Sequence, residues 1–212
     1  MRVTHLSLTD FRSYSQLNLE FEPGQNIFIG ENGEGKTNII EALMYLALLS
    51  SHRISTDQPL VKLGSERAYI RAKVESDNRS TLLELEINAA KANRAKINQN
   101  PARSQKELLG IVKSVCFSPE DLDLVRGDPS ERRSFMDQLL IQRSPRLAGV
   151  ITDYERALKQ RNSLLKSRAP IAALEPWNEH LANFGSEVVA GRLMLIKEIE
   201  PLFQNEIGRA HV

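Results

Sequence analysis

The chain has 212 residues, which suits one domain or a domain and a half and allows a sizeable core without disulfides. Its 28 basic and 27 acidic residues give a net charge of +1, so any nucleic acid must be bound by a local basic patch. A single cysteine excludes an intrachain disulfide and a cysteine-rich zinc site. The sequence shows no signal peptide and no apolar run of the roughly 18 residues that a membrane helix needs, which predicts a cytoplasmic protein without membrane contact.

The first part of the chain mostly alternates between apolar and polar residues, which predicts strands. A largely apolar stretch from Gly35 to about Ser50 predicts a buried helix, and residues 104–110 predict a short one. The apolar runs 26–29 and 112–117 have the composition of buried strands. We expect the other strands, half-buried and antiparallel, over residues 3–8, 16–21, 68–75, 83–88 and 94–98.

The pattern changes to helix near Ser118, and little strand pattern follows. Helices are predicted over 130–143, 146–168 and 174–204, with prolines near their boundaries. We therefore predict an α/β lobe over residues 1–118 and a helical lobe over residues 119–206.

One motif carries most of the chemistry. Residues 30–37 fit G-x-x-x-x-G-K-[ST] in full, between an apolar run and an apolar helix. The glycines let successive N–H groups face a polyphosphate at a helix N-terminus. Lys36 would reach the outer phosphates, and the Thr37 hydroxyl would bind Mg²⁺. The predicted nucleotide-binding residues are Gly30, Glu31, Asn32, Gly33, Glu34, Gly35, Lys36 and Thr37.

The motif does not specify a reaction, because hydrolysis also needs a carboxylate for the metal and one to position water. The nearest candidate, residues 115–121, is interrupted by Pro119. Glu120 and Asp121 equally fit carboxylates at a helix N-terminus. One alternative is therefore a small P-loop kinase that uses Glu120 or Asp121 as its metal ligand. The strand-rich stretch 67–98 and the lack of an arginine cluster for a lid count against it.

A local basic stretch lies in the helical lobe. Residues 145–168 hold six basic and two acidic side chains on an amphipathic helix. This pattern is typical of a sequence-independent contact with a phosphate backbone, and it is equally typical of a solvated helix face.

The motif at residues 30–37 is a P-loop. It is followed by NIIEAL (38–43), and DFRSY (10–14) precedes it. Together these segments resemble the SMC-like branch of the ABC-type ATPases, and within that branch the RecF family. These are bacterial DNA replication and repair proteins. The resemblance spans residues 1–206. It is supported in order by residues 51–53, 60–64, 117–122, 131–137, 154–166 and 176–177.

The resemblance implies a fold, a function and further site residues. The fold would be an α/β ABC-type head with antiparallel strands and a helical second lobe. Proteins of the family bind ATP with Mg²⁺, bind single- and double-stranded DNA, form ATP-dependent homodimers, and act with RecO and RecR to load RecA at gaps. By resemblance, Arg12 and Asn38 join the nucleotide site. Arg53 lies where SMC-like proteins often have an arginine that senses phosphate or DNA. Arg53, Arg156, Lys159, Arg161 and Lys166 are therefore candidates for DNA contact, and Glu120 is a candidate for approach to Mg²⁺ or water.

The chain also departs from the family pattern. It has no LSxGQ-like signature segment and no convincing Walker B strand, which in the family lie further along a chain nearly twice as long. We therefore expect an N-terminal part of such a head, with no catalytic residue assigned, weak nucleotide binding at most and no hydrolysis. An SMC-like structural head with a coiled-coil arm is the other alternative, and the short helical lobe with its several prolines counts against it.

The last six residues, 207–212 (IGRAHV), do not follow the family pattern. The nucleotide sequence ATC-GGA-AGA-GCA-CAC-GTC encodes these residues and resembles the start of a sequencing adapter. We therefore expect a non-native tail.

Overall fold

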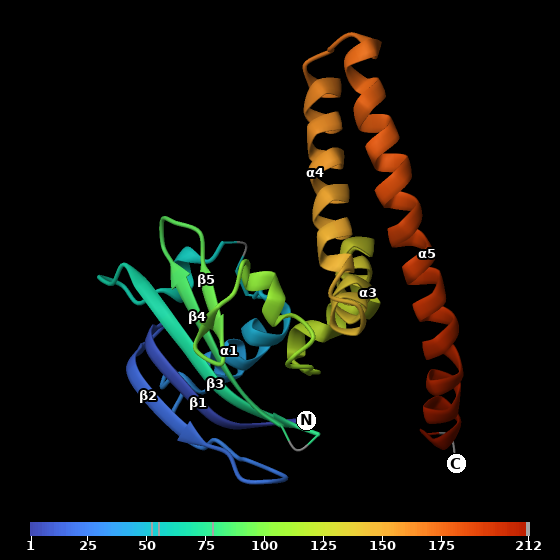
Figure 1. Ribbon diagram of the computed structural model, residues 1–212. Coiled ribbons are helices and arrows are strands. Elements are labelled where there is room, and N and C mark those ends of the chain that lie inside the picture. The colour runs from blue at the N-terminus through green and yellow to red at the C-terminus, as the bar shows by residue number, and fades with distance from the viewer. Residues whose placement is uncertain (52, 55, 78, 211–212) are drawn as a thin grey trace. The chain divides into compact units, whose positions relative to one another are not determined.

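A computed structural model describes residues 1–210 apart from 52, 55 and 78, and apart from the side chains of 120 and 208–210. The described residues divide into two compact units, one up to Phe117 and the other from Ser118 onward (Figure 1). Each unit has its own hydrophobic cluster, so each is described by itself.

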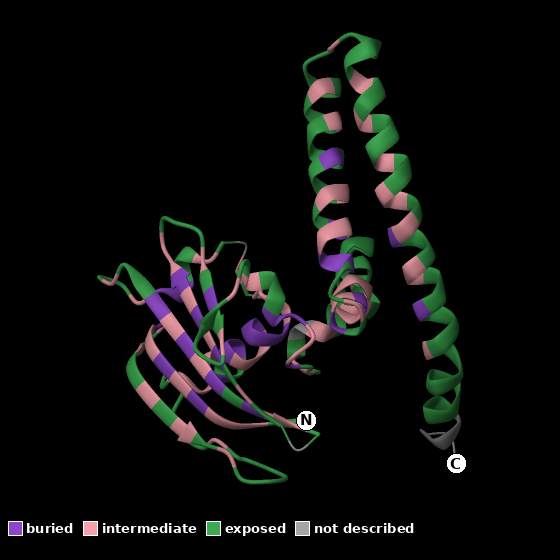
Figure 2. Ribbon diagram, viewed as in Figure 1, coloured by how far each residue is buried: buried purple, intermediate pink, exposed green. Residues whose placement is uncertain are grey.

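The first unit is built on an antiparallel sheet with strand order β2-β1-β3-β4-β5-β6. In the register, Leu8 lies opposite Ile70, and Ile70 lies opposite Leu85, so their side chains share one face. Residues of that face are buried and alternate with more exposed ones, as Figure 2 shows along the strands. The strands are β1 (Arg2–Phe11), β2 (Tyr14–Glu20), β3 (Arg67–Ser76), β4 (Arg79–Asn88), β5 (Arg94–Ile97) and β6 (Asn100–Pro101).

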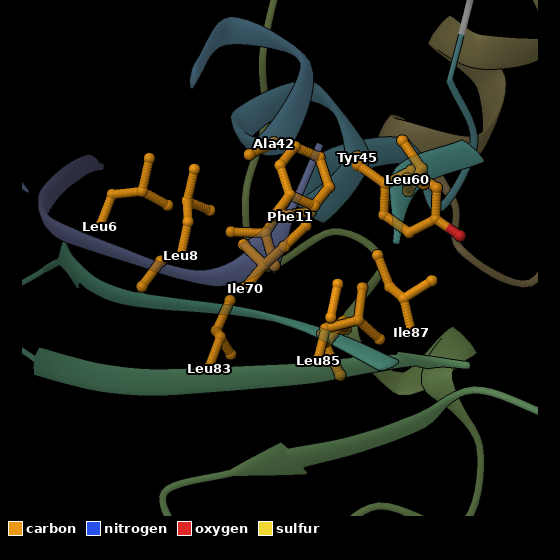
Figure 3. Packing of buried hydrophobic residues seen from close by; sticks show 14 of the residues in the cluster. Leu6, Leu8, Phe11, Ala42, Tyr45, Leu60, Ile70, Leu83, Leu85 and Ile87 are labelled. Atoms are coloured by element: carbon orange, nitrogen blue, oxygen red, sulfur yellow. The ribbon is translucent and has the colours of Figure 1, made fainter. Parts of the chain in front are cut away.

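Helix α1 (Lys36–Leu48) packs on the buried face of this sheet. Its residues Ala42, Tyr45 and Leu46 are fully buried with side chains of the strands, and Figure 3 shows Ala42 and Tyr45 close to Phe11. Asn93 Nδ2 donates hydrogen bonds to the Tyr45 hydroxyl at 3.4 Å and to Asp57 Oδ2 at 2.7 Å, so the buried phenol is not left without a polar partner. Two short 3₁₀ helices, η1 (Gln58–Leu60) and η2 (Gln105–Leu108), complete this unit.

The structure confirms the predicted α1, the strands of the alternating stretches and the short helix near residue 105. It contradicts two predictions, because residues 26–29 and 113–117 form no strand. Four of their apolar side chains face solvent instead: Ile27 is 78% exposed, Ile29 92%, Val115 92% and Phe117 85%. Phe28, in contrast, is half-buried and packs against the core of the unit. A strand needs hydrogen-bonded neighbours, and none of the described residues pairs with either segment. The apolar composition of these segments indicated that they tend to be buried. It could not indicate whether a neighbouring strand is present to pair with them.

The second unit is helical throughout. It contains η3 (Pro119–Leu122), α2 (Asp123–Arg126), α3 (Pro129–Arg143), α4 (Leu147–Lys166) and α5 (Ile171–Ala210). Its core is small and includes Leu140, Ile151 and Val188. Beside this core, Arg192 Nη2 lies 2.7 Å from Asp137 Oδ2, and both side chains are mostly buried. No helix in the described ranges combines the length and the apolar character needed to cross a membrane.

The sheet–helix core predicts a clear contrast between two leucines. Leu85→Ala should lower the free energy of unfolding by about 2–5 kcal/mol, because Leu85 is fully buried and its truncation leaves a cavity. Leu63→Ala, at a side chain 99% exposed, should change it by less than about 0.5 kcal/mol. Urea titrations followed by far-UV circular dichroism measure both. Equal losses in the two variants would contradict the packing.

Candidate nucleotide site

The P-loop, residues 30–37, leads directly into α1. Gly33 has φ +91° and Gly35 has φ +94°, both in the left-handed region that glycine adopts without strain. Because α1 begins at Lys36, the N–H groups of Lys36 and Thr37 precede the first hydrogen bonds of the helix and carry partial positive charge, whereas those of Asn38 and Ile39 donate to the Gly35 carbonyl. The loop therefore offers backbone donors to an anion.

The loop already holds an anionic group of its own chain. The Glu31 N–H donates a hydrogen bond to Glu34 Oε2 at 3.0 Å. Lys36 Nζ donates to the backbone carbonyls of Gly30 at 2.8 Å and Glu31 at 2.6 Å. A carboxylate oxygen thus accepts from the loop amide, and the ammonium group lies over the loop, where phosphate oxygens could replace the carbonyls as its acceptors. The donor set fits a polyphosphate.

The turn between β1 and β2 supports the loop from one side. A Cβ on Gly35 would lie 2.8 Å from the Tyr14 hydroxyl and 2.9 Å from Ser13 Oγ, so only glycine fits there. The Tyr14 hydroxyl donates to the Glu34 carbonyl at 3.3 Å, and Asn38 Nδ2 donates to Ser13 Oγ at 3.0 Å. Partial burial, together with the negative charge of Glu34, raises the pKa of Tyr14.

Arg12 lies in this turn with an unusual backbone. Its φ of +54° is in the left-handed region, which costs a non-glycine residue free energy unless its surroundings hold it. They do so here: the Arg12 N–H donates to the Leu60 carbonyl at 2.8 Å, and Arg12 Nη1 donates to the Pro59 carbonyl at 3.0 Å. The segment 59–62 thereby fixes Arg12 next to α1.

The guanidinium of Arg12 is bound to a buried carboxylate of α1, Glu41, which is 0% exposed. Arg12 Nε and Nη2 donate to the two Glu41 oxygens at 2.9 and 2.5 Å. Arg53 Nη1 donates to Glu41 Oε2 at 3.1 Å, and Ser51 Oγ donates to Glu41 Oε1 at 2.6 Å. Burial by itself would raise the pKa of Glu41, but hydrogen bonds from Arg12 and Ser51 and the charges of Arg12 and Arg53 outweigh it, so this pKa is lowered.

A hollow of about 580 Å³ lies beside Arg12 and reaches Asn38, the residue of α1 that follows Thr37. It is lined by both polar and apolar groups, a mixture that suits a nucleoside beside the phosphates. Its lining residues include Arg12, Ser13, Asn38, Pro59, Val61 and Leu63.

The structure brings the P-loop residues, Asn38, Arg12 and Arg53 together around the start of α1. Sequence reasoning missed Glu41, although one signal was available: it is an acidic residue within a largely apolar helix that is predicted to be buried. The side chain of Glu120 lies outside the part of the structure that is described. Among the described residues, no group of three or more His, Cys, Asp and Glu side chains is placed to hold a metal.

The remaining candidates for DNA contact lie on α4, in the second unit. Arg156, Lys159 and Lys166 are exposed, and the described residues provide no ion pair for either lysine. Arg156 lies 3.9 Å from Asp153 and is 70% exposed, so that ion pair is weak. Arg161 Nε instead donates to Asn178 Oδ1 at 2.6 Å and connects α4 to α5.

We compared the chain with known protein families and with curated proteins. A family model described as an AAA domain matches residues 5–183. The chain is 53% identical over 212 residues to the DNA replication and repair protein RecF of Streptomyces avermitilis. It is 51% identical to the RecF of Kineococcus radiotolerans and 52% identical to that of Paenarthrobacter aurescens. These alignments cover 94–95% of this chain but only 52–57% of the relatives, so the chain spans about half the length of the curated relatives it matches.

Solved structures of RecF proteins also match this chain. A RecF described as a recombination mediator protein in the RecFOR pathway, with ATPrS, matches 93% of this chain and 55% of its own, with a TM-score of 0.86 and 30% identity. The RecF–ATP structure matches with a TM-score of 0.83. A structure from a study of SMC ATPases matches with a TM-score of 0.52 and 20% identity, which shows a shared fold alone.

The P-loop geometry predicts different costs for two glycine substitutions. Gly33→Ala should lower the free energy of unfolding by about 1 kcal/mol, because φ is positive but nothing lies within 4 Å of the new Cβ. Gly35→Ala should lower it by a further 1–3 kcal/mol or so, because its Cβ also overlaps Tyr14 and Ser13. Urea unfolding of both variants measures the difference. Equal costs would mean that the turn does not press on Gly35.

Proposed function

Because this chain belongs to the RecF family of DNA replication and repair proteins and carries an AAA domain, we propose that it binds ATP at its P-loop and binds DNA through its helical lobe. The observation that carries the proposal is the complete P-loop at the exposed N-terminus of a buried helix, with a lysine above the loop and two arginines beside it.

Each part of the site has a task in this proposal. The loop amides and Lys36 bind the phosphates, and Asn38 holds the turn residue Ser13 against the loop. The Thr37 hydroxyl would be a ligand of Mg²⁺, which supplies charge neutralisation between the phosphates when bound. The hollow beside Arg12 receives the nucleoside.

The exposed face of α4 is the proposed DNA contact. Arg156, Lys159 and Lys166 recur at helical spacing and span about 15 Å at 1.5 Å per residue, enough to reach more than one phosphate of a strand. A hollow of about 500 Å³ on the same face is lined by Glu155, Leu158, Lys159, Asn162, Ser163 and Lys166. It offers amide, hydroxyl and ammonium groups, together with one carboxylate that opposes the lysine charges. Such contacts do not depend on base sequence.

The wider biological role rests on the family likeness. We propose that this protein acts in gap repair, as an ATP-dependent homodimer that binds single-strand gaps and duplex DNA and aids RecA loading together with RecO and RecR. The likeness to a RecF described in the RecFOR pathway supports this assignment. The 212 residues contain no signature segment and no convincing Walker B strand, so we expect them to bind nucleotide weakly and not to hydrolyse it.

Lys36→Ala should weaken ATP binding at least about tenfold, because the variant loses the charge-assisted bonds to the outer phosphates. Calorimetric titration with Mg–ATP measures the dissociation constant. Lys96→Ala is the matched control, since Lys96 lies on the sheet and pairs with Glu84 at 3.1 Å, away from the P-loop. Equal affinities of wild type and Lys36→Ala would contradict the assignment of the site. If the wild type released phosphate from ATP and Lys36→Ala abolished this release, the expectation of no hydrolysis would be contradicted.

The α4 face predicts a salt-dependent affinity for DNA. The Lys159→Ala, Lys166→Ala double variant should reduce the slope of log affinity against log salt by about 1.8, or 0.9 for each lost phosphate contact. The matched control replaces Arg143 and Arg146, which pair with Glu198 and Glu187, and also removes two positive charges. Fluorescence anisotropy with labelled duplex DNA at several salt concentrations gives both slopes. Identical slopes for the two double variants would contradict a specific role of this face.

A further inference from the structure

The P-loop is closed by hydrogen bonds among its own residues. The Glu34 N–H donates to the Glu31 carbonyl at 3.5 Å, and the Glu31 N–H donates to Glu34 Oε2 at 3.0 Å. Lys36 Nζ also donates to the Glu31 carbonyl, at 2.6 Å. Both backbone groups of Glu31 are therefore bound by side chains of the same loop, and one of these side chains is negatively charged.

The Glu34 carboxylate lies directly against the backbone of Gly30. A Cβ on Gly30 would overlap Glu34 Oε2 and would lie 3.9 Å from Lys36 Nζ. Gly30 is not among the glycines with positive φ, so its backbone conformation is open to other residues as well. Glycine at position 30 instead leaves free the space that the carboxylate oxygen fills, beside the ammonium group of the loop.

A bound polyphosphate needs this part of the loop. Phosphate oxygens bind to a P-loop through its backbone N–H groups and through the ammonium group of its lysine. Glu34 Oε2 already accepts from one N–H of the loop, and its charge has the same sign as that of a phosphate. The carboxylate and the phosphates therefore compete for donors, and they repel each other when both are close to Lys36.

The side chain of Glu34 can leave the loop while its backbone stays in place. Glu34 is exposed and has no ion pair among the described residues, so water can replace the Glu31 N–H as its partner. Its carbonyl, in contrast, accepts from the Tyr14 hydroxyl at 3.3 Å. Departure of the carboxylate thus frees a loop donor and keeps the path of the loop.

We propose that the Glu34 carboxylate is an internal competitor of the phosphate chain, which binds only after this carboxylate has left the Glu31 N–H. This inference rests on the proposed nucleotide binding, and it gives a physical cause for the weak binding expected of these residues. The backbone of Glu34 belongs to the P-loop, but its side chain opposes the ligand. Glu34 thereby determines the affinity for phosphate groups without binding them.

A purely structural role of Glu34 predicts the opposite sign. If the bond between Glu34 and Glu31 only kept the loop in shape, its loss would distort the loop and weaken nucleotide binding. If the carboxylate competes with phosphate, its loss strengthens binding. The direction of the change therefore separates the two roles.

The experiment compares wild type and Glu34→Ala by calorimetric titration with Mg–ATP and with Mg–tripolyphosphate. We expect Glu34→Ala to bind ATP about tenfold more tightly, the range of one charge-assisted hydrogen bond that no longer has to be broken. Tripolyphosphate affinity should rise by a similar factor, because the competition lies at the phosphates. Unchanged or weaker binding of either probe would overturn the proposal.

Glu31→Ala measures the effect of charge alone. It removes one negative charge from the same loop, but the Glu31 side chain has no hydrogen bond or ion pair among the described residues. Neither position has a positive φ, so alanine fits both. Glu31→Ala should strengthen ATP binding by less than about threefold, as expected for an exposed charge. A gain equal to that of Glu34→Ala would overturn the assignment to the Glu34 contact.

A readout without nucleotide tests the contact itself. In spectra of protein labelled with ¹⁵N-glutamate, the Glu31 amide is identified by its loss in Glu31→Ala. In Glu34→Ala this amide proton should move upfield and exchange faster with water, because it has lost its acceptor. An unchanged Glu31 amide would overturn the proposal whatever the affinities are.

The outcomes also separate this proposal from the proposed function. If wild type and Glu34→Ala bind Mg–ATP with equal affinity, only the competition is refuted, and the nucleotide site stands. If neither binds Mg–ATP, the proposed nucleotide binding is refuted, and the competition with it.

Discussion

The packing of α1 against the antiparallel sheet is the constraint on which the rest of the first unit depends. Ala42, Tyr45 and Leu46 are fully buried against the strands, so the axis and rotation of the helix are fixed. Its N-terminus then fixes the P-loop, whose donors can face an anion only if the helix does not move. The same packing removes Glu41 from water, and a carboxylate at that position requires the arginines that it binds.

Local patterns were sufficient to predict most of the fold. Alternation along residues 68–75 and 83–88 predicted β3 and β4, because one face of each strand is buried and the other is solvated. The motif at 30–37 predicted the loop and the helix after it, since its residue types suit a single backbone path. The runs at 26–29 and 112–117 failed because strand formation depends on a neighbour that no local pattern reveals.

The arrangement around Glu41 was beyond prediction for a related reason. Arg12 lies 29 positions before Glu41, and Arg53 lies 12 positions after it, so their meeting depends on how the turn, the helix and the following loop pack together. A resemblance to a family can suggest that each arginine matters. It cannot show that both arginines bind the same carboxylate, because that depends on distances in the three-dimensional structure.

The solvent-facing side chains of Ile27, Ile29, Val115 and Phe117 have an energetic meaning. Burying one large apolar side chain yields roughly 1.5–3 kcal/mol, so these four leave unrealised roughly 6–12 kcal/mol. That sum is comparable with the whole net stability of an ordinary domain. The described fold thus carries, on two short segments, a reserve of hydrophobic free energy about as large as the margin by which a domain stays folded.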